Sequence, residues 1–274
     1  MEILCTLDLM FKSMKKISFI ILGLIVIISC NSNSASETIV PPATIQQSSI
    51  QIINQYPHNE SSFTEGLEYR DSILFEGTGL YGTSKLSKIN LISGKDIQKI
   101  DLDKKYFGEG ITIINSKIFQ LTYKEEKCFV YDAKSFKKLQ EFSYKGEGWG
   151  MTNDGKQIIM SNGSNNLYYR NTNTFAEENI VAIFDEYGPL ANINELEYVD
   201  GFIYANVWLK KYIVKIDPKQ GKVMAKYDFS GLMNQYMPNL HQDAVLNGIA
   251  YNKQKQTFYI TGKNWPLLFE VKMN

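Results

Sequence analysis

The sequence predicts an all-β protein: a five-bladed β-propeller closed by pairing of its N-terminal strand with its last blade. Three observations predict this fold: short alternating strands, a motif that returns about every 40–50 residues, and a surplus strand at the start of the repeats that matches a missing one at their end. A β-sandwich is the alternative, but it does not account for the period. The core is large, because 44% of the 274 residues are hydrophobic and 13% are aromatic.

The strands are short runs of β-branched and aromatic residues in alternation. Clear examples occupy residues 72–76, 117–122, 202–207, 212–216 and 257–261. Asp-Gly, Asn-Gly and Ser-Gly dipeptides separate such runs, and no segment keeps an apolar period of 3.6 residues for three turns. These features favour strands over helices throughout the body of the chain.

The repeated unit opens with a small or turn-forming residue just before a strand. Its five copies are Phe63-Thr-Glu-Gly-Leu, Phe107-Gly-Glu-Gly-Ile, Gly148-Trp-Gly-Met, Asn194-Glu-Leu-Glu and Leu246-Asn-Gly-Ile. Aligning Gly66, Gly110, Gly150, Leu196 and Gly248 gives steps of 44, 40, 46 and 52 residues. The last unit ends one strand short after residues 267–272, and residues 50–56 supply the missing strand. Their pairing would remove two open sheet edges.

The N-terminal segment resembles the leader of an exported bacterial lipoprotein. Met14, the expected true start, precedes two lysines and an apolar run over residues 17–28, which is shorter than the ~20 residues of a membrane span. Ser29-Cys30 then fits a lipobox, and an uncleaved anchor is the alternative. The predicted divisions are a signal peptide over 1–29, a polar tether from a lipidated Cys30 over 30–49, and a propeller over 50–274. The predicted location is the bacterial cell envelope, with the chain anchored to a membrane and facing the periplasm or the surface.

Composition excludes several classes of function. Lys+Arg and Asp+Glu both number 29, so the formal net charge is zero and the basic excess typical of nucleic-acid binding is missing. Two histidines, His58 and His241, and three cysteines are too few for a convincing zinc or iron–sulfur site. The Gly77-Thr-Gly-Leu-Tyr-Gly82 segment matches a dinucleotide pattern, but a strand-like alternation follows it instead of a helix. We therefore expect a connecting loop there.

Carboxylates, aromatic residues and one lysine remain as candidates for chemistry. Related positions at the starts of four successive units, where loops of all blades converge near the axis, hold Glu65, Glu109, Trp149, Asn194 and Glu195. Lys263 and Trp265 follow the second strand of the fifth unit. Each residue alone has a plain structural interpretation, since tryptophans often pack between blades and glutamates are often solvated. Their recurrence at one structural position favours a shared site.

In this order, the motifs resemble the plant and bacterial type of glutaminyl-peptide cyclotransferase. The resemblance runs from about residue 50 to the C-terminus and includes Glu76-Gly-Thr-Gly-Leu-Tyr-Gly, Ala205-Asn-Val-Trp and Thr261-Gly-Lys-Asn-Trp-Pro. It implies a five-bladed propeller and an acyltransferase that converts N-terminal glutamine to pyroglutamate with release of ammonia, without a catalytic metal. The implied substrate is a peptide or protein with N-terminal glutamine. We expect a monomer that needs no cofactor, binds no nucleic acid and reaches the membrane through the lipid on Cys30.

The resemblance also assigns roles to residues. Glu109 would carry the protons, while Lys263 and Asn194 would stabilise negative charge on the reacting amide oxygen. The residues implied in substrate binding are Phe63, Glu65, Tyr123, Trp149 and Trp208. Two of them depart from the family, which commonly has Gln at the position of Glu65 and Trp at the position of Tyr123. These departures leave substrate preference and rate open.

Two other classes of function compete with this interpretation. A non-catalytic, lipid-tethered propeller could grip a peptide or glycan with its axial aromatic residues, but it leaves the combination of Glu109 and Lys263 unexplained. A lactonase-like propeller would need a carboxylate and amide cage around a divalent cation.

Overall fold

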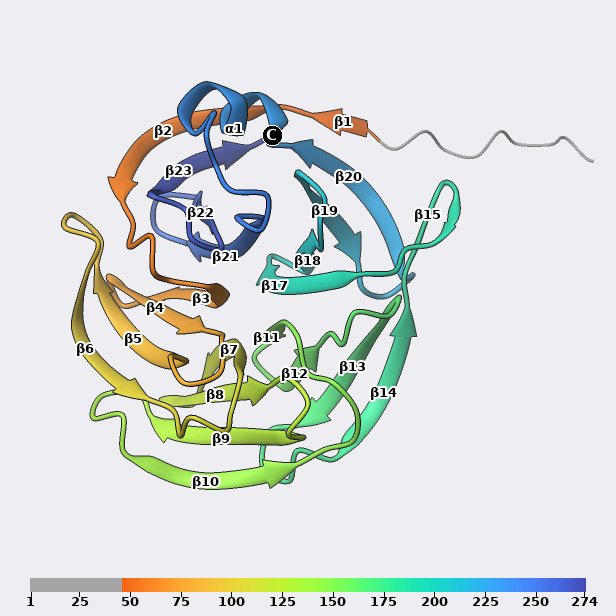
Figure 1. Ribbon diagram of the computed structural model, residues 1–274. Helices are drawn as coiled ribbons and strands as arrows, with labels where there is room; N and C mark the ends of the chain where they lie inside the picture. Colours follow the sequence, from red (N-terminus) through yellow and green to blue (C-terminus); the bar gives the residue numbers. More distant parts are fainter. Residues whose placement is uncertain (1–45) are drawn as a thin grey trace, which may run out of the picture. The chain divides into compact units, whose positions relative to one another are not determined.

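A computed structural model describes residues 46–274, which form a ring of five β-sheets around a central axis (Figure 1). Each sheet contains four consecutive antiparallel strands, except that the fifth takes one strand from the start of the ring. The predicted five-bladed propeller is therefore confirmed. The predicted signal peptide, Cys30 and the tether up to residue 45 lie outside the described residues.

The first three sheets have simple meander topology, and their first strands lie nearest the axis. The first sheet contains β3 (Thr64–Arg70), β4 (Ile73–Thr78), β5 (Lys85–Asn90) and β6 (Lys95–Asp101). The second contains β7 (Gly108–Ile114), β8 (Lys117–Thr122), β9 (Lys127–Asp132) and β10 (Lys138–Ser143). The third contains β11 (Met151–Asn153), β12 (Gln157–Met160), β13 (Asn166–Asn171) and β14 (Glu177–Ala182).

The fourth sheet carries additions at its outer edge. Its main strands are β17 (Ile193–Val199), β18 (Phe202–Val207), β19 (Tyr212–Asp217) and β20 (Lys222–Asp228). The outer strand β20 pairs in parallel with β1 (Gln46–Ser48) and with β15 (Phe184–Asp185), which forms a small hairpin with β16 (Gly188–Pro189). Residues 46–48, assigned above to the tether, thus form part of a sheet. A short helix, α1 (Ser230–Tyr236), follows β20 and is an element that the strand pattern did not predict.

The fifth sheet closes the ring. It contains β21 (Leu246–Asn252), β22 (Thr257–Gly262), β23 (Leu267–Met273) and β2 (Ile50–Pro57). Strand β2 pairs antiparallel with β23 from Ile50 opposite Met273 to Pro57 opposite Leu267. The prediction that an N-terminal strand completes the last blade is confirmed. This pairing covers the edge of β23, and β2 becomes the outermost strand of the fifth sheet.

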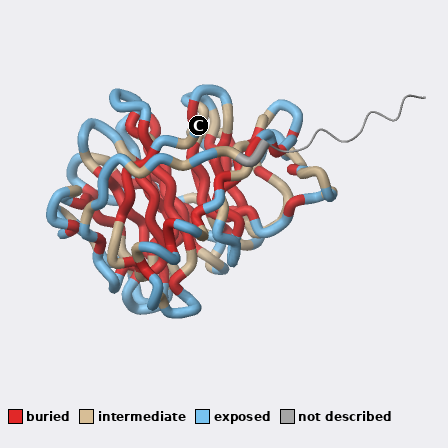
Figure 2. Tube along the Cα trace, turned by 90° about the horizontal axis from the view of Figure 1, so that it is seen from above, coloured by how far each residue is buried: buried red, intermediate tan, exposed pale blue. Residues whose placement is uncertain are grey.

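Burial decreases from the axis outward (Figure 2). Every residue of β7, on the inside of the second blade, is buried, whereas β10 on the outside of the same blade is exposed at all but one position. Buried apolar side chains from neighbouring sheets form the core between the blades. The innermost strands are covered on both faces, so the polar residues that they carry, such as Glu65, Glu109 and Glu195, are buried as well.

The register corrects the alignment of the fourth repeat. Leu67, Ile111, Met151, Leu196 and Ile249 all lie opposite the corresponding residue of the second strand in their own sheet. The residue that matches Gly66, Gly110, Gly150 and Gly248 is therefore Glu195 and not Leu196. The corrected positions, 66, 110, 150, 195 and 248, give steps of 44, 40, 45 and 53 residues.

Close approach of the inner strands explains the recurring glycine. A Cβ atom on Gly110 would lie 2.5 Å from the carbonyl oxygen of Trp149, and one on Gly150 would collide with the backbone of Asn194. Only a residue without a side chain lets neighbouring blades meet this closely. In the fourth blade the Glu195 carboxylate is buried and accepts backbone N–H bonds from Leu67 at 3.1 Å and Ile249 at 2.8 Å.

Two further features complete the fold. Residues 79–84 form the loop between β4 and β5, so the glycine-rich segment is a connector between strands, as predicted. Among the described helices, none is long and apolar enough to cross a membrane.

Candidate active site

The residue that precedes the glycine position on each innermost strand is a floor position of the propeller. By the corrected register, the five floor positions hold Glu65, Glu109, Trp149, Asn194 and Asn247. The first four line a common pocket, and Asn247 lies directly behind Glu65. The sequence prediction missed Asn247, although the alignment of Gly248 with the other glycines already placed it at this position.

A second set of side chains comes from the loop after the second strand of each sheet. The backbone N–H groups of Tyr123, Trp208 and Lys263 donate to carbonyl oxygens just before the first strand of the same sheet, at 3.0, 2.8 and 2.9 Å. These bonds extend the strand pairing by one step beyond β8, β18 and β22. They hold all three side chains at the same end of the axis as the floor positions.

The two sets enclose a pocket of about 250 Å³. This is smaller than the ~300–1,000 Å³ of pockets for drug-sized ligands, and it suits a single residue. Its lining contains all eight predicted catalytic and substrate-binding residues together with Phe107: Phe63, Glu65, Phe107, Glu109, Tyr123, Trp149, Asn194, Trp208 and Lys263. Phe107 lies inside a motif that the sequence analysis quoted, but nothing in the alternation of that segment shows that its ring faces the axis.

Aromatic rings form the walls. Trp149 and Trp208 meet edge to face at 5.7 Å, and Phe107 contacts Tyr123 at 5.6 Å between ring centres. Gly79 makes room for the Phe107 ring, because a Cβ atom at that position would overlap it. Trp208 is 39% exposed and so stands at the mouth, whereas the polar floor is almost completely buried. The wall therefore offers flat apolar faces above a charged floor.

The lysine of the pocket pairs with Glu65. Lys263 Nζ lies 2.7 Å from Glu65 Oε1, and both side chains are more than nine-tenths buried. The other oxygen of Glu65 accepts from Asn247 Nδ2 at 3.2 Å. Lys263 Nζ also lies 4.5 Å from the centre of the Phe63 ring, a cation–π contact. Glu65 therefore neutralises the ammonium and is already engaged by two protein donors.

Glu109 is a buried carboxyl group whose surroundings favour its neutral form. Burial raises its pKa well above the ordinary value, and the charge of Glu65 raises it further, although the ammonium of Lys263 acts in the opposite direction. Burial raises the pKa of Glu65 as well, but the charge and hydrogen bond of Lys263 and the hydrogen bond with Glu109 act against this rise, whereas the hydrogen bond with Glu65 raises the pKa of Glu109 further. Two carboxyl groups next to one ammonium thus divide their roles, with Glu65 as the ion-pair partner and Glu109 as the group that holds a proton.

Two polar side chains of the pocket, Trp149 and Asn194, differ in whether they have a hydrogen-bond partner. The Trp149 indole Nε1 donates to Glu147 at 3.0 Å, which fixes the ring against the pocket. The amide oxygen of Asn194 is buried and has no hydrogen-bond partner among the described residues. Since buried acceptors are nearly always paired, this oxygen is notable beside a ligand-sized space.

Two candidates from the sequence lie outside the pocket. Glu195 lies deeper along the axis, where its carboxylate binds two backbone N–H groups. Trp265 is completely buried, and its indole Nε1 donates to the carbonyl oxygen of Ala244 at 2.9 Å. The contacts of both residues stabilise the fold. This agrees with the structural role that the sequence analysis gave as the alternative for each residue alone.

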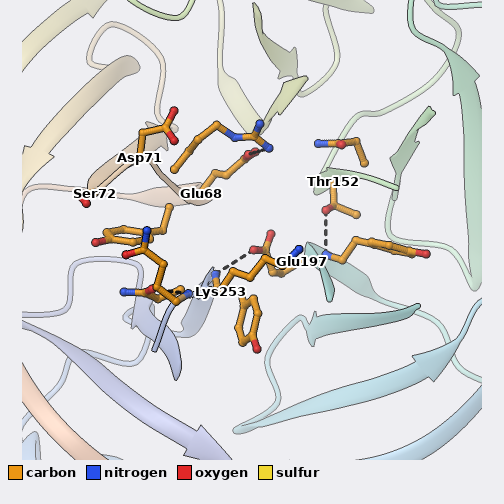
Figure 3. Close-up of a pocket in the computed structure, with 13 residues that line it drawn as sticks. Glu68, Asp71, Ser72, Thr152, Glu197 and Lys253 are labelled. Atoms are coloured by element: carbon orange, nitrogen blue, oxygen red, sulfur yellow. Dashed lines mark hydrogen bonds and ion pairs between the residues drawn. The ribbon is translucent and has the colours of Figure 1, made fainter. Parts of the chain in front are cut away.

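A larger cavity of about 630 Å³ lies at the opposite end of the inner strands (Figure 3). Its two buried carboxylates are committed to the fold: Glu68 accepts from Ile113 N at 2.6 Å and pairs with Arg70, and Glu197 accepts from Tyr251 N at 2.9 Å. Burial raises the pKa of Glu68 to about 7 and that of Glu197 well above its usual range. Within residues 46–274, no group of three His, Cys, Asp or Glu side chains is placed to hold a metal ion.

The fold and the pocket together define a class: a five-bladed propeller whose axial pocket combines aromatic walls, a buried carboxyl group of raised pKa and a paired ammonium. The sequence places the chain within that class. Residues 21–273 match the model of the glutamine cyclotransferase family, and the chain belongs to this family.

Two relatives share most of the chain. It is 34% identical over 227 residues to a glutaminyl-peptide cyclotransferase of Arabidopsis thaliana, an alignment that covers 82% of this chain and 71% of the relative. It also matches the crystal structure of Myxococcus xanthus glutaminyl cyclase with a TM-score of 0.79 and 31% identity, covering 83% of this chain and 97% of that one. The predicted family is therefore confirmed.

The pocket yields a prediction about the pKa of Glu109. Glu65→Gln removes a neighbouring negative charge and leaves the Lys263 ammonium uncompensated, and both changes favour ionisation of Glu109. The pKa of Glu109 should therefore fall. Carbonyl ¹³C NMR of glutamate-labelled protein, with Glu109→Gln to assign the signal, measures it. Glu147→Gln should lower it in the same direction but by less, since Glu147 is the weakest of the named contributors. An unchanged or higher pKa in Glu65→Gln would contradict this description of the pocket.

Proposed function

We propose that this protein is a glutaminyl-peptide cyclotransferase that converts the N-terminal glutamine of a peptide or protein to pyroglutamate and releases ammonia. The single observation that carries the proposal is the placement of Glu109, Glu65 and Lys263 on the floor of one residue-sized aromatic pocket. Membership of the glutamine cyclotransferase family supports it. Both named relatives are described by this activity.

The reaction needs orientation more than activation. The α-amine of the substrate must attack the γ-carboxamide carbon of the same residue, so the flexible side chain has to fold back on itself. Holding the two reacting groups together can lower the barrier by about 7–11 kcal/mol in well-oriented systems. The aromatic rings of Trp149, Trp208 and Phe107 line a small pocket, which favours the folded side chain.

Glu109 is suited to move the protons. In its ionised form it takes a proton from the attacking amine, and it then gives that proton to the departing NH₂ group, which leaves as ammonia. A new C–N bond closes the five-membered lactam as the old one breaks, and Glu109 returns to its starting state. A carboxyl group with a raised pKa is better matched to this exchange near neutral pH than an ordinary one.

Lys263 and Asn194 are placed to oppose the negative charge on the amide oxygen. An ammonium has three N–H donors, and the contact with Glu65 uses one of them. Asn194 lines the same pocket, and its side-chain Nδ2 group is the part of the amide that can donate to that oxygen. Donors fixed in a water-poor site stabilise an oxyanion without reorganising, typically by about 3–4 kcal/mol for each donor.

We propose that the reaction is independent of metal. All proton transfers and charge stabilisation described above use side chains of the pocket, so chelators should leave the activity unchanged.

The first test concerns Glu109. With a glutamine-initiated peptide, Glu109→Gln should reduce ammonia release by about 10²–10⁴-fold, because the proton carrier is lost. The variant should unfold at no lower temperature at pH 7. A carboxyl group whose pKa is raised in the folded state disfavours folding above its ordinary pKa, and Gln removes that effect. Enzymatic ammonia detection and thermal unfolding provide the two measurements. Full activity would exclude Glu109 as the proton carrier, and peptide binding without ammonia release by the wild-type protein would favour a non-catalytic propeller.

The second test concerns Lys263. Lys263→Met keeps most of the volume but leaves Glu65 without its cation, so the double variant Lys263→Met with Glu65→Gln serves as the matched control. If the ammonium stabilises the transition state, kcat should fall by about 10²-fold or more in both variants while KM changes little. Steady-state kinetics measure both constants. A rise of KM alone would reassign Lys263 to ground-state binding, and recovery of kcat in the double variant would mean that the lysine only neutralises Glu65.

We also propose that the protein is an exported lipoprotein held at the membrane by lipid on Cys30. The support is sequence alone: a basic start at Met14, the apolar run over residues 17–28 and Ser29-Cys30. Incorporation of labelled palmitate in the native host should vanish in Cys30→Ala and remain in Cys128→Ala, since Cys128 is buried in the propeller. Label that persists in Cys30→Ala would refute lipidation at this residue.

A further inference from the structure

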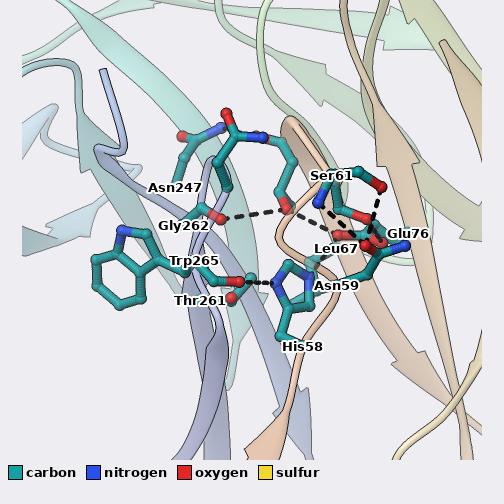
Figure 4. A network of polar contacts seen from close by, with 12 residues as sticks. His58, Asn59, Ser61, Leu67, Glu76, Asn247, Thr261, Gly262 and Trp265 are labelled. Carbon is teal, nitrogen blue, oxygen red and sulfur yellow. Dashed lines mark hydrogen bonds and ion pairs between the residues drawn. The ribbon is translucent and has the colours of Figure 1, made fainter. Parts of the chain in front are cut away.

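A buried histidine–glutamate pair lies next to the active-site pocket (Figure 4). His58 follows the closing strand β2, and its Nε2 lies 2.8 Å from Glu76 Oε1 on β4. Its Nδ1 lies 2.7 Å from the carbonyl oxygen of Trp265. The side chains of His58 and Glu76 are 3% and 1% exposed, so water does not screen the contact.

The contacts assign charges to both members of the pair. A carbonyl oxygen only accepts, so the proton of the contact with Trp265 resides on His58 Nδ1. Glu76 accepts hydrogen bonds from the hydroxyl groups of Thr64 at 2.7 Å and Ser62 at 3.1 Å, which is the behaviour of a carboxylate. His58 Nε2 therefore also carries a proton, and the pair is an imidazolium beside a carboxylate.

The electrostatic surroundings agree with this assignment. Burial lowers the pKa of His58, but the charge and hydrogen bond of Glu76 outweigh it, and the net pKa is raised. Burial raises the pKa of Glu76, but the charge and hydrogen bonds of His58 and Thr64 bring it below the ordinary value. The other charged group that acts on the pair is Lys85, which lowers both pKa values and is itself paired with Asp96.

The pair joins the two segments that supply the charged floor of the pocket. Glu76 accepts hydrogen bonds from the hydroxyl groups of Ser62 and Thr64. These two residues flank Phe63, and Thr64 directly precedes Glu65. His58 holds the carbonyl of Trp265, two residues after Lys263. Two backbone bonds link the same segments: His58 N donates to Pro266 O at 2.8 Å, and Asn264 N donates to Ser62 O at 2.8 Å.

We propose that His58 and Glu76 are positioning residues whose ion pair sets the placement of Lys263 against Glu65, so that closing the propeller also assembles its active site. The proposal rests on the proposed cyclotransferase function. The strand β2 that completes the last blade ends one residue before His58, and the lysine lies in the turn that this histidine holds. Breaking the pair should loosen that turn without removing any group that touches the substrate.

The ion pair itself is tested on the wild-type protein without any assay of activity. The chain has only two histidines, and the second, His241, has a side chain that is 73% exposed and gives an internal comparison. In ¹⁵N-histidine NMR, both ring nitrogens of His58 should still be protonated at pH 8, well above the ~6.5 of an ordinary histidine. A neutral ring at pH 8, with one unprotonated nitrogen, would overturn the proposal.

Steady-state kinetics of two variants then distinguish a positioning role of the His58–Glu76 pair from a purely stabilising one. Glu76→Gln should lower kcat by about 10–100-fold and change KM by less than about threefold, because a small displacement of Lys263 affects the transition state more than binding. The matched control is Glu270→Gln. Glu270 is equally buried and ties β2 to β23 through Tyr56 at 2.9 Å, but it lies beside Thr257, at the end of the fifth blade away from the pocket.

Both variants should melt at a lower temperature than the wild type, and only Glu76→Gln should lose kcat per folded molecule. Equal kcat in the two variants would overturn the positioning role. A wild-type protein that releases no ammonia would instead refute the proposed function, while the imidazole spectrum would still decide whether the ion pair exists.

Discussion

The close approach of five inner strands at the axis is the constraint on which the rest of the molecule depends. Backbones at this distance leave no room for a Cβ atom at Gly66, Gly110 or Gly150, so space alone fixes this residue in the first three units. The neighbouring residue on each strand then points to the pocket end of the axis. Packing thus delivers one side chain from each blade to the same small volume, and chemistry can vary at those floor positions without disturbing the ring.

The electrostatics of the pocket follow from that convergence. Two carboxyl groups and one ammonium are forced together where water is scarce, so one ammonium can balance only one carboxylate at low cost. Lys263 Nζ pairs with Glu65 at 2.7 Å, and the pKa of Glu109 is raised by burial and by the charge of Glu65. An acid with a raised pKa destabilises the folded state at neutral pH, and the aromatic and backbone contacts of the ring offset that cost. Functional sites commonly contain groups that lower the stability of the folded state in this way.

Repetition made the fold and most of the site readable from sequence. The period gave the blade count, the alternation gave strands such as 117–122 and 202–207, and the unequal ends gave the closure. The repeat pointed to five of the residues that line the pocket, whereas Phe63, Tyr123 and Trp208 followed only from the family resemblance. The five are Glu65, Glu109, Trp149, Asn194 and Lys263. What the repeat could not supply was register: only the strand pairing shows that Glu195, not Leu196, is the counterpart of the glycines. Asn247 directly precedes the aligned Gly248, but nothing in the sequence shows that it contacts Glu65. Likewise, nothing in a linear pattern shows that Lys263 would pair with Glu65 instead of Glu109, because the choice depends on side-chain distances across two blades.

Closure and chemistry are connected through residues that are far apart in the chain. Lys263 comes from the last blade and Glu65 from the first, so their contact spans the joint where the ring is completed. Strand β2 crosses the same joint and leads directly to His58. If the joint opened, the ammonium and its carboxylate would separate before any blade lost its own hydrogen bonds. No single blade contains both Lys263 and Glu65. The charged floor of the pocket therefore forms only when the propeller is completely folded.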